Sequence, residues 1–157
     1  MQPFNVNVLT PLWEKRNVWV STHIPLNSSI LDIGCGNKSI LKYVNCTDYL
    51  GLDKTEYADI NTDLNNETVK IPKVYDIGLI LGVLEYVDDP IEVISKYKNN
   101  ANTWIILTKS CKKKEQHNWK HSFNVSFLEY ICYKNFTNVT IITSYNGYLL
   151  GICNNEI

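Results

Sequence analysis

The chain has 157 residues and a formal net charge of −1, which suits one domain with a buried core but leaves no room for a separate substrate domain. Its near-neutral charge provides no general attraction to nucleic acid or to anionic membranes, so we expect neither as a partner. Five cysteines without a C-x-x-C pair argue against a disulfide framework or a zinc knuckle.

Residues 1–12 of the N-terminal segment, 1–27, lack the basic start and apolar stretch of a secretory signal, and no apolar run is long enough to cross a membrane. We therefore expect a cytoplasmic protein. Trp13, Arg16 and Trp19 in this segment have a helix-like spacing. The segment is expected to be helical and either to pack on the core or to form a lid.

Strand-like and helix-like patterns then alternate. Residues 29–33 and 48–52 are apolar strand candidates, and 38–44 between them places its apolar residues on one helical face. A short strand is expected at 58–62. The nearly continuous apolar run 74–81 is typical of a strand buried on both faces of a parallel sheet.

The second half continues the alternation. Asp89 and Pro90 open a helix, residues 104–108 form a strand, and Ser126 is expected to cap a helix that runs to Tyr133. Strands at 138–143 and 148–153 flank Asn146-Gly147, a turn signal for an antiparallel hairpin. The whole chain, 1–157, is predicted to be one α/β domain with a Rossmann-like, mostly parallel sheet, a C-terminal antiparallel hairpin and helices on both faces.

A glycine turn after the first strand is the main functional signal. Such a turn lets backbone approach a ligand closely, and Gly34 and Gly36 stand directly after the strand that ends near Ile33. Asp32, two positions before Gly34, would repel a pyrophosphate but suits the ammonium group of a bound amino acid. S-adenosyl-L-methionine (SAM), which has an ammonium and a ribose but no phosphate, fits this position better than a dinucleotide.

The second strand supports a nucleoside ligand. It ends at Asp53, 19 positions after Gly34, close to the roughly 20 expected of a ribose-binding acid. Ser39 stands where the NAD fingerprint has Gly or Ala, which disfavours an NAD-dependent oxidoreductase. A tight turn without any ligand is the plain alternative.

With these pieces in order, the chain resembles the class I SAM-dependent methyltransferases from about residue 28 to its end. Two motifs carry the resemblance. Residues 31–36, Leu-Asp-Ile-Gly-Cys-Gly, look like the family's cofactor loop, and residues 75–90 are similar to its fourth strand and the following turn.

The resemblance implies a set of cofactor-binding residues. Asp32 and the backbone of the glycine turn would hold the methionine part, Asp53 would receive the ribose hydroxyls, and the remaining positions would contact the adenine or the amino acid end. Asp53 and Asp63 have an alternative reading as ordinary helix or turn caps. The full set is Asp32, Gly34, Cys35, Gly36, Asp53, Asp63, Leu64, Leu81 and Gly82.

The sequence departs from the family pattern at three places. Many relatives carry a third glycine where Lys38 stands, and a lysine there would either clash with the cofactor or pair with its carboxylate. Many also have His where Tyr86 stands, next to the fourth strand. The usual insertions that cover the substrate are missing, which leaves the N-terminal segment and the 109–122 loop as a lid.

Methyl transfer requires alignment, exclusion of water and, for some acceptors, a base. We expect His117 or His121 to be the base or a substrate anchor, with Tyr86 as a further catalytic candidate, because the loop that carries the histidines leaves the cofactor edge of the sheet. Histidines that merely face solvent are the alternative. The four-residue spacing of the histidines near Cys111 also raises a metal site, but no third ligand has a recognisable spacing and we predict none.

The acceptor is inferred mainly by exclusion. Base-amino methyltransferases carry an Asn/Asp-Pro-Pro-aromatic motif after the fourth strand, whereas this chain has Leu-Gly-Val-Leu at 81–84. We therefore expect O-methylation of a small hydroxylated molecule such as a sugar or a metabolite. The alternative is a noncatalytic methyltransferase-like module that binds a cofactor or a protein.

Overall fold

A computed structural model describes residues 11–111, 118–144 and 146–155. These residues form a seven-stranded sheet in the order β3-β2-β1-β4-β5-β7-β6. Neighbours among β1 to β5 are parallel, and β7 runs antiparallel between β5 and β6. The predicted mostly parallel sheet with a C-terminal hairpin is confirmed. The strands are β1 (Ser28–Ile33), β2 (Cys46–Asp53), β3 (Ile60–Asn61), β4 (Tyr75–Leu81), β5 (Ala101–Lys109), β6 (Asn138–Thr143) and β7 (Tyr148–Asn154).

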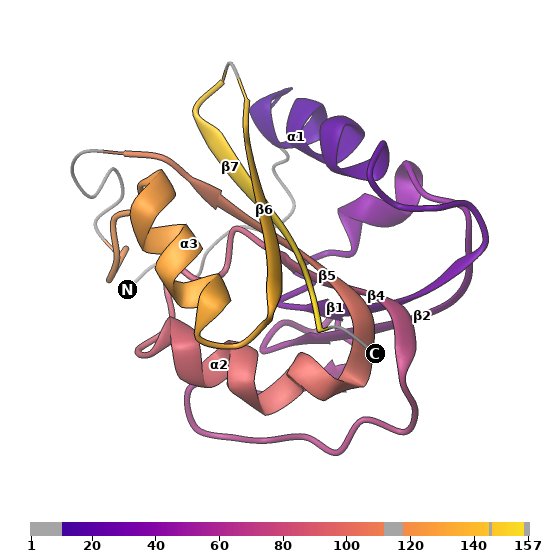
Figure 1. The fold of residues 1–157 in the computed structure, drawn as a ribbon. Coiled ribbons are helices and arrows are strands. Elements are labelled where there is room, and N and C mark those ends of the chain that lie inside the picture. The colour runs from indigo at the N-terminus through magenta and orange to yellow at the C-terminus, as the bar shows by residue number, and fades with distance from the viewer. Residues whose placement is uncertain (1–10, 112–117, 145, 156–157) are drawn as a thin grey trace.

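Helices cover both faces of the sheet (Figure 1). On one face, α1 (Pro11–Ser21) and the 3-10 turn η1 (Ser39–Lys42) pack through Val20 and Ile40. On the other, α2 (Pro90–Tyr97), which continues into η2 (Lys98–Asn100), and α3 (Val125–Tyr133) pack through Ile94 and Ile131. The apolar faces of α2 and α3 therefore pack against the sheet, where their burial contributes most to stability. No helix among the described residues is both long enough and apolar enough to cross a membrane.

Local signals explain where two of the helices begin. Asp89 caps α2 as predicted, because its Oδ1 accepts the N–H groups of Ile91 and Glu92 at 2.9 and 3.1 Å. The expected cap of α3 at Ser126 is wrong. Asn124 caps this helix instead, since its Oδ1 accepts the Phe127 N–H at 2.8 Å.

The helix expected over 38–44 is also wrong, because only the one-turn η1 forms there. Strand β2 already begins at Cys46, so few residues remain after the glycine turn, and no side chain caps the first turn of η1. A chain this short gains little from an α-helix, whose first turn is costly to form.

The parallel arrangement brings three loops to one edge of the sheet. Strands β1, β2 and β4 end at Ile33, Asp53 and Leu81, and their carboxyl ends lie side by side because β1 pairs with both neighbours. In open α/β sheets this edge is where ligands bind.

Candidate active site

The turn after β1 is held in a conformation that glycine adopts most readily. Gly34 and Gly36 have φ angles of 78° and 54°, and the Gly34 N–H donates to the Leu52 carbonyl at 2.7 Å. A Cβ on Gly34 would lie 2.3 Å from a methyl carbon of Val83, whereas a Cβ on Gly36 would meet no atom within 4 Å. Gly34 is therefore needed for packing, and Gly36 borders open space in which a ligand has room.

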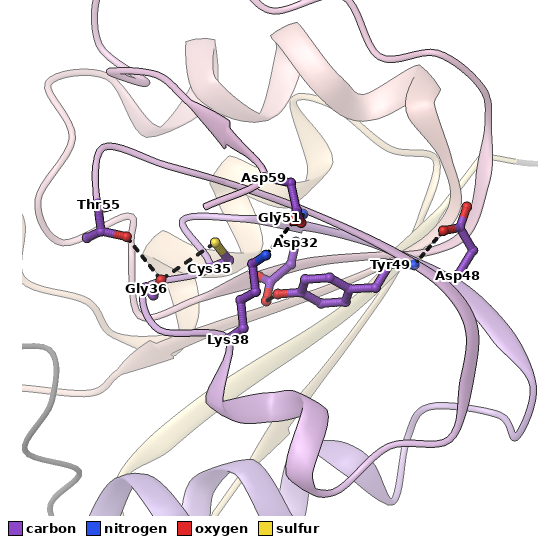
Figure 2. A network of polar contacts seen from close by, with 9 residues as sticks. All are labelled: Asp32, Cys35, Gly36, Lys38, Asp48, Tyr49, Gly51, Thr55 and Asp59. Carbon is purple, nitrogen blue, oxygen red and sulfur yellow. Dashed lines mark hydrogen bonds and ion pairs between the residues drawn. The ribbon is translucent and has the colours of Figure 1, made fainter. Parts of the chain in front are cut away.

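Asp32 lies beneath this turn and is only 2% exposed. Its Oδ2 accepts a hydrogen bond from the Tyr49 hydroxyl at 2.7 Å (Figure 2). Its Oδ1 is buried and has no hydrogen-bond partner among the described residues. Burial raises the pKa of Asp32 to about 7, against the opposing effects of the Tyr49 hydrogen bond and the charge of Arg16. A buried carboxylate oxygen without a partner is costly, which makes this atom a candidate ligand contact.

Asp53 joins the turn after β1 to the turn after β2. Its Oδ2 accepts the Gly36 N–H at 2.9 Å, and its Oδ1 accepts the Thr55 N–H at 3.1 Å. The Thr55 hydroxyl in turn donates to the Gly36 carbonyl at 3.1 Å. Each oxygen of an ionised carboxylate has a second lone pair, so Asp53 can still receive hydroxyl groups while it holds the turn.

The remaining predicted positions follow β3 and β4. Asp63 acts as a turn cap, since its Oδ1 accepts the Asn65 N–H at 3.0 Å, and the adjacent Leu64 is buried. Leu81 is buried, and the Gly82 N–H already donates to the Leu107 carbonyl at 2.8 Å. Cys35 is likewise buried beside the first turn. These residues lie around one edge of the sheet, and their roles toward a cofactor stay predictions.

A small cavity remains beside Asp32, and Lys38 is not among the residues that line it. Its ammonium pairs with Asp59, whose other oxygen accepts the Gly51 N–H at 2.8 Å, and it also lies over the Tyr49 ring (Figure 2). The φ of Lys38 is 58°, a left-handed conformation that favours glycine. This backbone angle explains why a glycine suits the position.

Helix α1 closes the space above Asp32. A cavity of about 30 Å³ remains there, lined by Arg16, Asn17, Asp32, Gly34, Cys35, Ser39, Ile40 and Leu81. That volume holds about one or two water molecules. The Asn17 amide donates to the Ser39 hydroxyl at 2.9 Å and so ties α1 to η1. The described part of the N-terminal segment packs on the sheet through Val20, and a role as a lid stays a prediction.

Arg16 is the cation that fills this space. Its Nε and Nη2 donate to Asn17 Oδ1 at 3.1 and 3.0 Å, and its Nη1 would lie 3.1 Å from a Cβ on Gly82. Burial lowers the pKa of Arg16, while nearby Tyr148 and Asp32 raise it. The helical spacing of 13–19 indicated this face of α1, but no sequence signal placed the guanidinium beside Asp32.

Glu85 is a second buried acid that the sequence analysis missed. It is 2% exposed, and its Oε1 accepts the Lys109 N–H at 2.9 Å. Its Oε2 is buried without a hydrogen-bond partner in the described part of the chain, and burial raises its pKa. The signal that could have found it is its place in the turn after β4, within the second motif of the resemblance.

The catalytic candidates lie beyond β4. The Tyr86 ring packs edge-on against Trp119, and burial raises the pKa of the phenol, so this group keeps its proton at neutral pH. Nε2 of His121 lies 3.0 Å from the Val87 carbonyl oxygen and 3.2 Å from that of Asp88. If Nε2 carries the proton donated there, Nδ1 is the atom that accepts one. His117 lies outside the described residues. Within the part of the chain that the structure describes, no three His, Cys, Asp or Glu side chains gather as a metal site requires.

A larger cavity opens on the other side of Arg16. Its volume is about 240 Å³, and it lies between α1 and the turn end of the β6–β7 hairpin. Figure 1 shows these two elements next to each other. The lining residues are Lys15, Arg16, Trp19, Ile142, Thr143, Ser144, Asn146 and Tyr148.

No protein-family model matches the sequence, and no curated protein matches it either. Solved structures do match. The N-methyltransferase NodS from Bradyrhizobium japonicum, in complex with S-adenosyl-L-homocysteine (SAH), is 16% identical over 94% of this chain and 89% of its own, with a TM-score of 0.67. The chain has the class I methyltransferase fold.

Two further methyltransferase structures match at similar levels. An O-methyltransferase family protein from Burkholderia thailandensis is 14% identical over 91% of this chain and 56% of its own, with a TM-score of 0.67. A SAM-dependent methyltransferase from Aquifex aeolicus is 15% identical over 96% of this chain and 92% of its own, with a TM-score of 0.61.

Proposed function

We propose that the protein is a SAM-dependent methyltransferase and that SAM binds at the turn after β1. The observation that carries the proposal is the buried, unpartnered Oδ1 of Asp32 beneath that turn. An ammonium group supplies the charge and the N–H donors that this oxygen lacks. Structures with the same fold that contain SAH support the choice of ligand.

The chemistry of the lining residues fits the cofactor. Asp53 would accept the ribose hydroxyls, open space beside Gly36 would admit the nucleoside, and Asp63 with Leu64 would border the adenine. The cavity of about 30 Å³ beside Asp32 is too small for the methionine part. Binding therefore requires the Arg16 side chain to move, and the ammonium would replace its positive charge beside Asp32.

When bound, the cofactor supplies an electrophilic methyl group, which the acceptor takes as its bond to sulfur breaks and the electron pair stays on sulfur. The chain's own residues align the acceptor and exclude water, and α1 covers the site for this purpose. We propose O-methylation of a small hydroxylated molecule. His121 through Nδ1, or His117, would receive the hydroxyl proton, and the Tyr86 phenol would donate a hydrogen bond rather than act as a base.

Calorimetric titration with SAM and SAH tests whether the protein binds the cofactor. A screen of hydroxylated acceptors with methyl-labelled SAM tests whether it transfers the methyl group. Saturable binding and transfer of label are expected. Replacing both histidines by Ala should lower turnover at saturating SAM, and unchanged turnover would remove them as bases.

A noncatalytic, methyltransferase-like module is the second candidate. The small size of the cavity beside Asp32, with Arg16 in it, favours this alternative. Binding of SAM without transfer to any acceptor would support a regulatory cofactor-binding role. An absence of SAM binding would support a protein-interaction module instead.

A further inference from the structure

The cavity of about 240 Å³ contains two cations and no carboxylate. Lys15 and Arg16 line it from α1, and none of its other lining residues is acidic. The Arg16 guanidinium donates hydrogen bonds to the neutral side chain of Asn17, and the charges of Asp32 and Glu85 act on it from outside this lining. Inside the larger cavity, however, no carboxylate offsets the two positive charges, and a cation that borders such a space attracts an anion. The lining thus favours an anionic ligand.

The same cavity offers ring surfaces and hydroxyl groups. Lys15 and Trp19 are four residues apart on α1 and so share one helix face. Tyr148 and Thr143 line the cavity from the hairpin. A cavity of about 150 Å³ holds one benzene ring, so this one has room for a single substituted ring. Aromatic side chains prefer such rings as neighbours.

The cavity lies at the edge of the sheet where chemistry would occur. Tyr148 pairs with Lys109 at the carboxyl end of β5, next to the end of β4. Arg16 lines both this cavity and the smaller one that contains Asp32. A ligand in the larger cavity would therefore meet the cofactor site at Arg16.

We propose that this cavity is the acceptor site and that the acceptor is a small hydroxylated aromatic carboxylic acid. Its carboxylate pairs with Lys15, which lines only the larger cavity, and its hydroxyl lies at Arg16, where the two cavities meet. The inference rests on the proposed methyltransferase function and names its substrate class.

Arg16 then also activates the nucleophile. A cation beside a phenol stabilises the phenolate and lowers the pKa of the hydroxyl. The proton passes to the histidine base proposed above, the phenolate oxygen forms a bond to the methyl carbon, and the sulfur–carbon bond breaks with its electron pair left on sulfur.

A matched pair of probes tests the acid specificity. 4-Hydroxybenzoate and 4-hydroxybenzyl alcohol share the ring and the hydroxyl, but only the first is an anion. Titrations followed by NMR at low salt, with and without SAH, should give at least about fivefold tighter binding of the acid. Lys15→Gln should abolish that preference, whereas Lys134→Gln, at the C-cap of α3 on the opposite face of the sheet, should keep it.

A second readout tests Arg16. The ultraviolet absorbance of bound 4-hydroxybenzoate should report a lower phenol pKa in the wild type than in Arg16→Gln, with circular dichroism as the check of folding. Equal affinity for the two probes, no binding of either, or a preference that survives Lys15→Gln would overturn the proposal. SAM binding without acid preference would refute only this inference, whereas Lys15-dependent acid binding without SAM binding would refute only the methyltransferase function.

Discussion

The Tyr49 hydroxyl donates to Oδ2 of Asp32 at 2.7 Å, from the strand next to the one that carries the acid. One oxygen of Asp32 is thereby fixed within the sheet, and the other is left buried without a partner among the described residues. The hydrogen bond favours the ionised carboxylate, while burial disfavours it. Tyr49 is therefore a positioning residue that sets how much of Asp32 is charged near neutral pH.

Removing this hydroxyl should weaken cofactor binding. In Tyr49→Phe the pKa of Asp32 should rise above about 7, so less of the carboxylate is available to an ammonium group. We expect SAH to bind roughly tenfold more weakly at about pH 7, with a smaller difference at about pH 8.5. Calorimetric titration at the two pH values measures this. Tyr133→Phe, on the exposed side of α3, is the control, and equal SAH affinity in Tyr49→Phe and the wild type would contradict the role of Tyr49.

Asp32 should also make the folded state less stable as pH rises. The folded protein keeps the Asp32 proton up to about pH 7, whereas an unperturbed Asp releases it near 3.8. Between these values the folded state binds more protons, so the free energy of unfolding falls with increasing pH. Asp32→Asn cannot titrate, and it should be more stable than the wild type above pH 7, by up to roughly 4 kcal/mol.

Urea unfolding of both proteins between about pH 5 and pH 8 tests this difference. Asp76 provides a control, because its contribution to the free energy of unfolding changes with pH in the opposite direction. The Ser29 N–H and hydroxyl donate to Asp76 and lower its pKa, so its stabilisation is present above the unfolded pKa and is lost in acid. Asp76→Asn should therefore reduce stability at neutral pH. Identical pH slopes for Asp32→Asn and the wild type would show that Asp32 is not buried as described.

The two glycines of the first turn should respond differently to alanine. Gly34→Ala places a Cβ 2.3 Å from Val83, so it should lower the free energy of unfolding by about 2–4 kcal/mol, and Val83→Ala in the same chain should restore part of that loss. Gly36→Ala meets no atom and should cost only about 1–2 kcal/mol from its left-handed backbone. Its Cβ would enter the space proposed for the cofactor. A folded Gly36→Ala that binds SAH as well as the wild type would argue against that placement.

Lys38 combines a strained backbone with an ion pair to Asp59, and two substitutions separate these contributions. Lys38→Gly relieves the left-handed conformation but loses the ion pair, and the two effects should nearly cancel. Lys38→Ala loses the ion pair and keeps the strain, so it should be about 1 kcal/mol less stable than Lys38→Gly. Thermal unfolding of the two variants side by side measures this difference in stability. An alanine variant as stable as the glycine variant would refute strain at this position.

Features that depend on local sequence could be predicted, whereas contacts across the fold could not. The strand-acid-glycine pattern at 29–36 and the Asn146-Gly147 turn depend on neighbouring residues, and the sheet and hairpin they predicted are present. The contact of Tyr49 with Asp32 requires the parallel register of β1 and β2, which no local pattern encodes. The place of Arg16 depends in the same way on how α1 docks on the sheet. The backbone N–H groups that Asp53 and Asp63 accept depend on how the turns fold, and the roles of the acids toward a cofactor remain predictions.

Arg16 should slow the entry of the cofactor. Arg16 lines the cavity of about 30 Å³ beside Asp32, and its Nη1 lies near the end of β4 at Gly82. If the guanidinium has to leave before the methionine part enters, the binding-competent state is a minor one and association is slowed. Arg16→Ala should then bind SAH with a faster association rate, by about threefold or more, in stopped-flow measurements of tryptophan fluorescence. Lys15→Ala, the neighbouring cation that does not line this cavity, should leave the rate unchanged. A slower association in Arg16→Ala would show that Arg16 attracts the cofactor rather than blocks it.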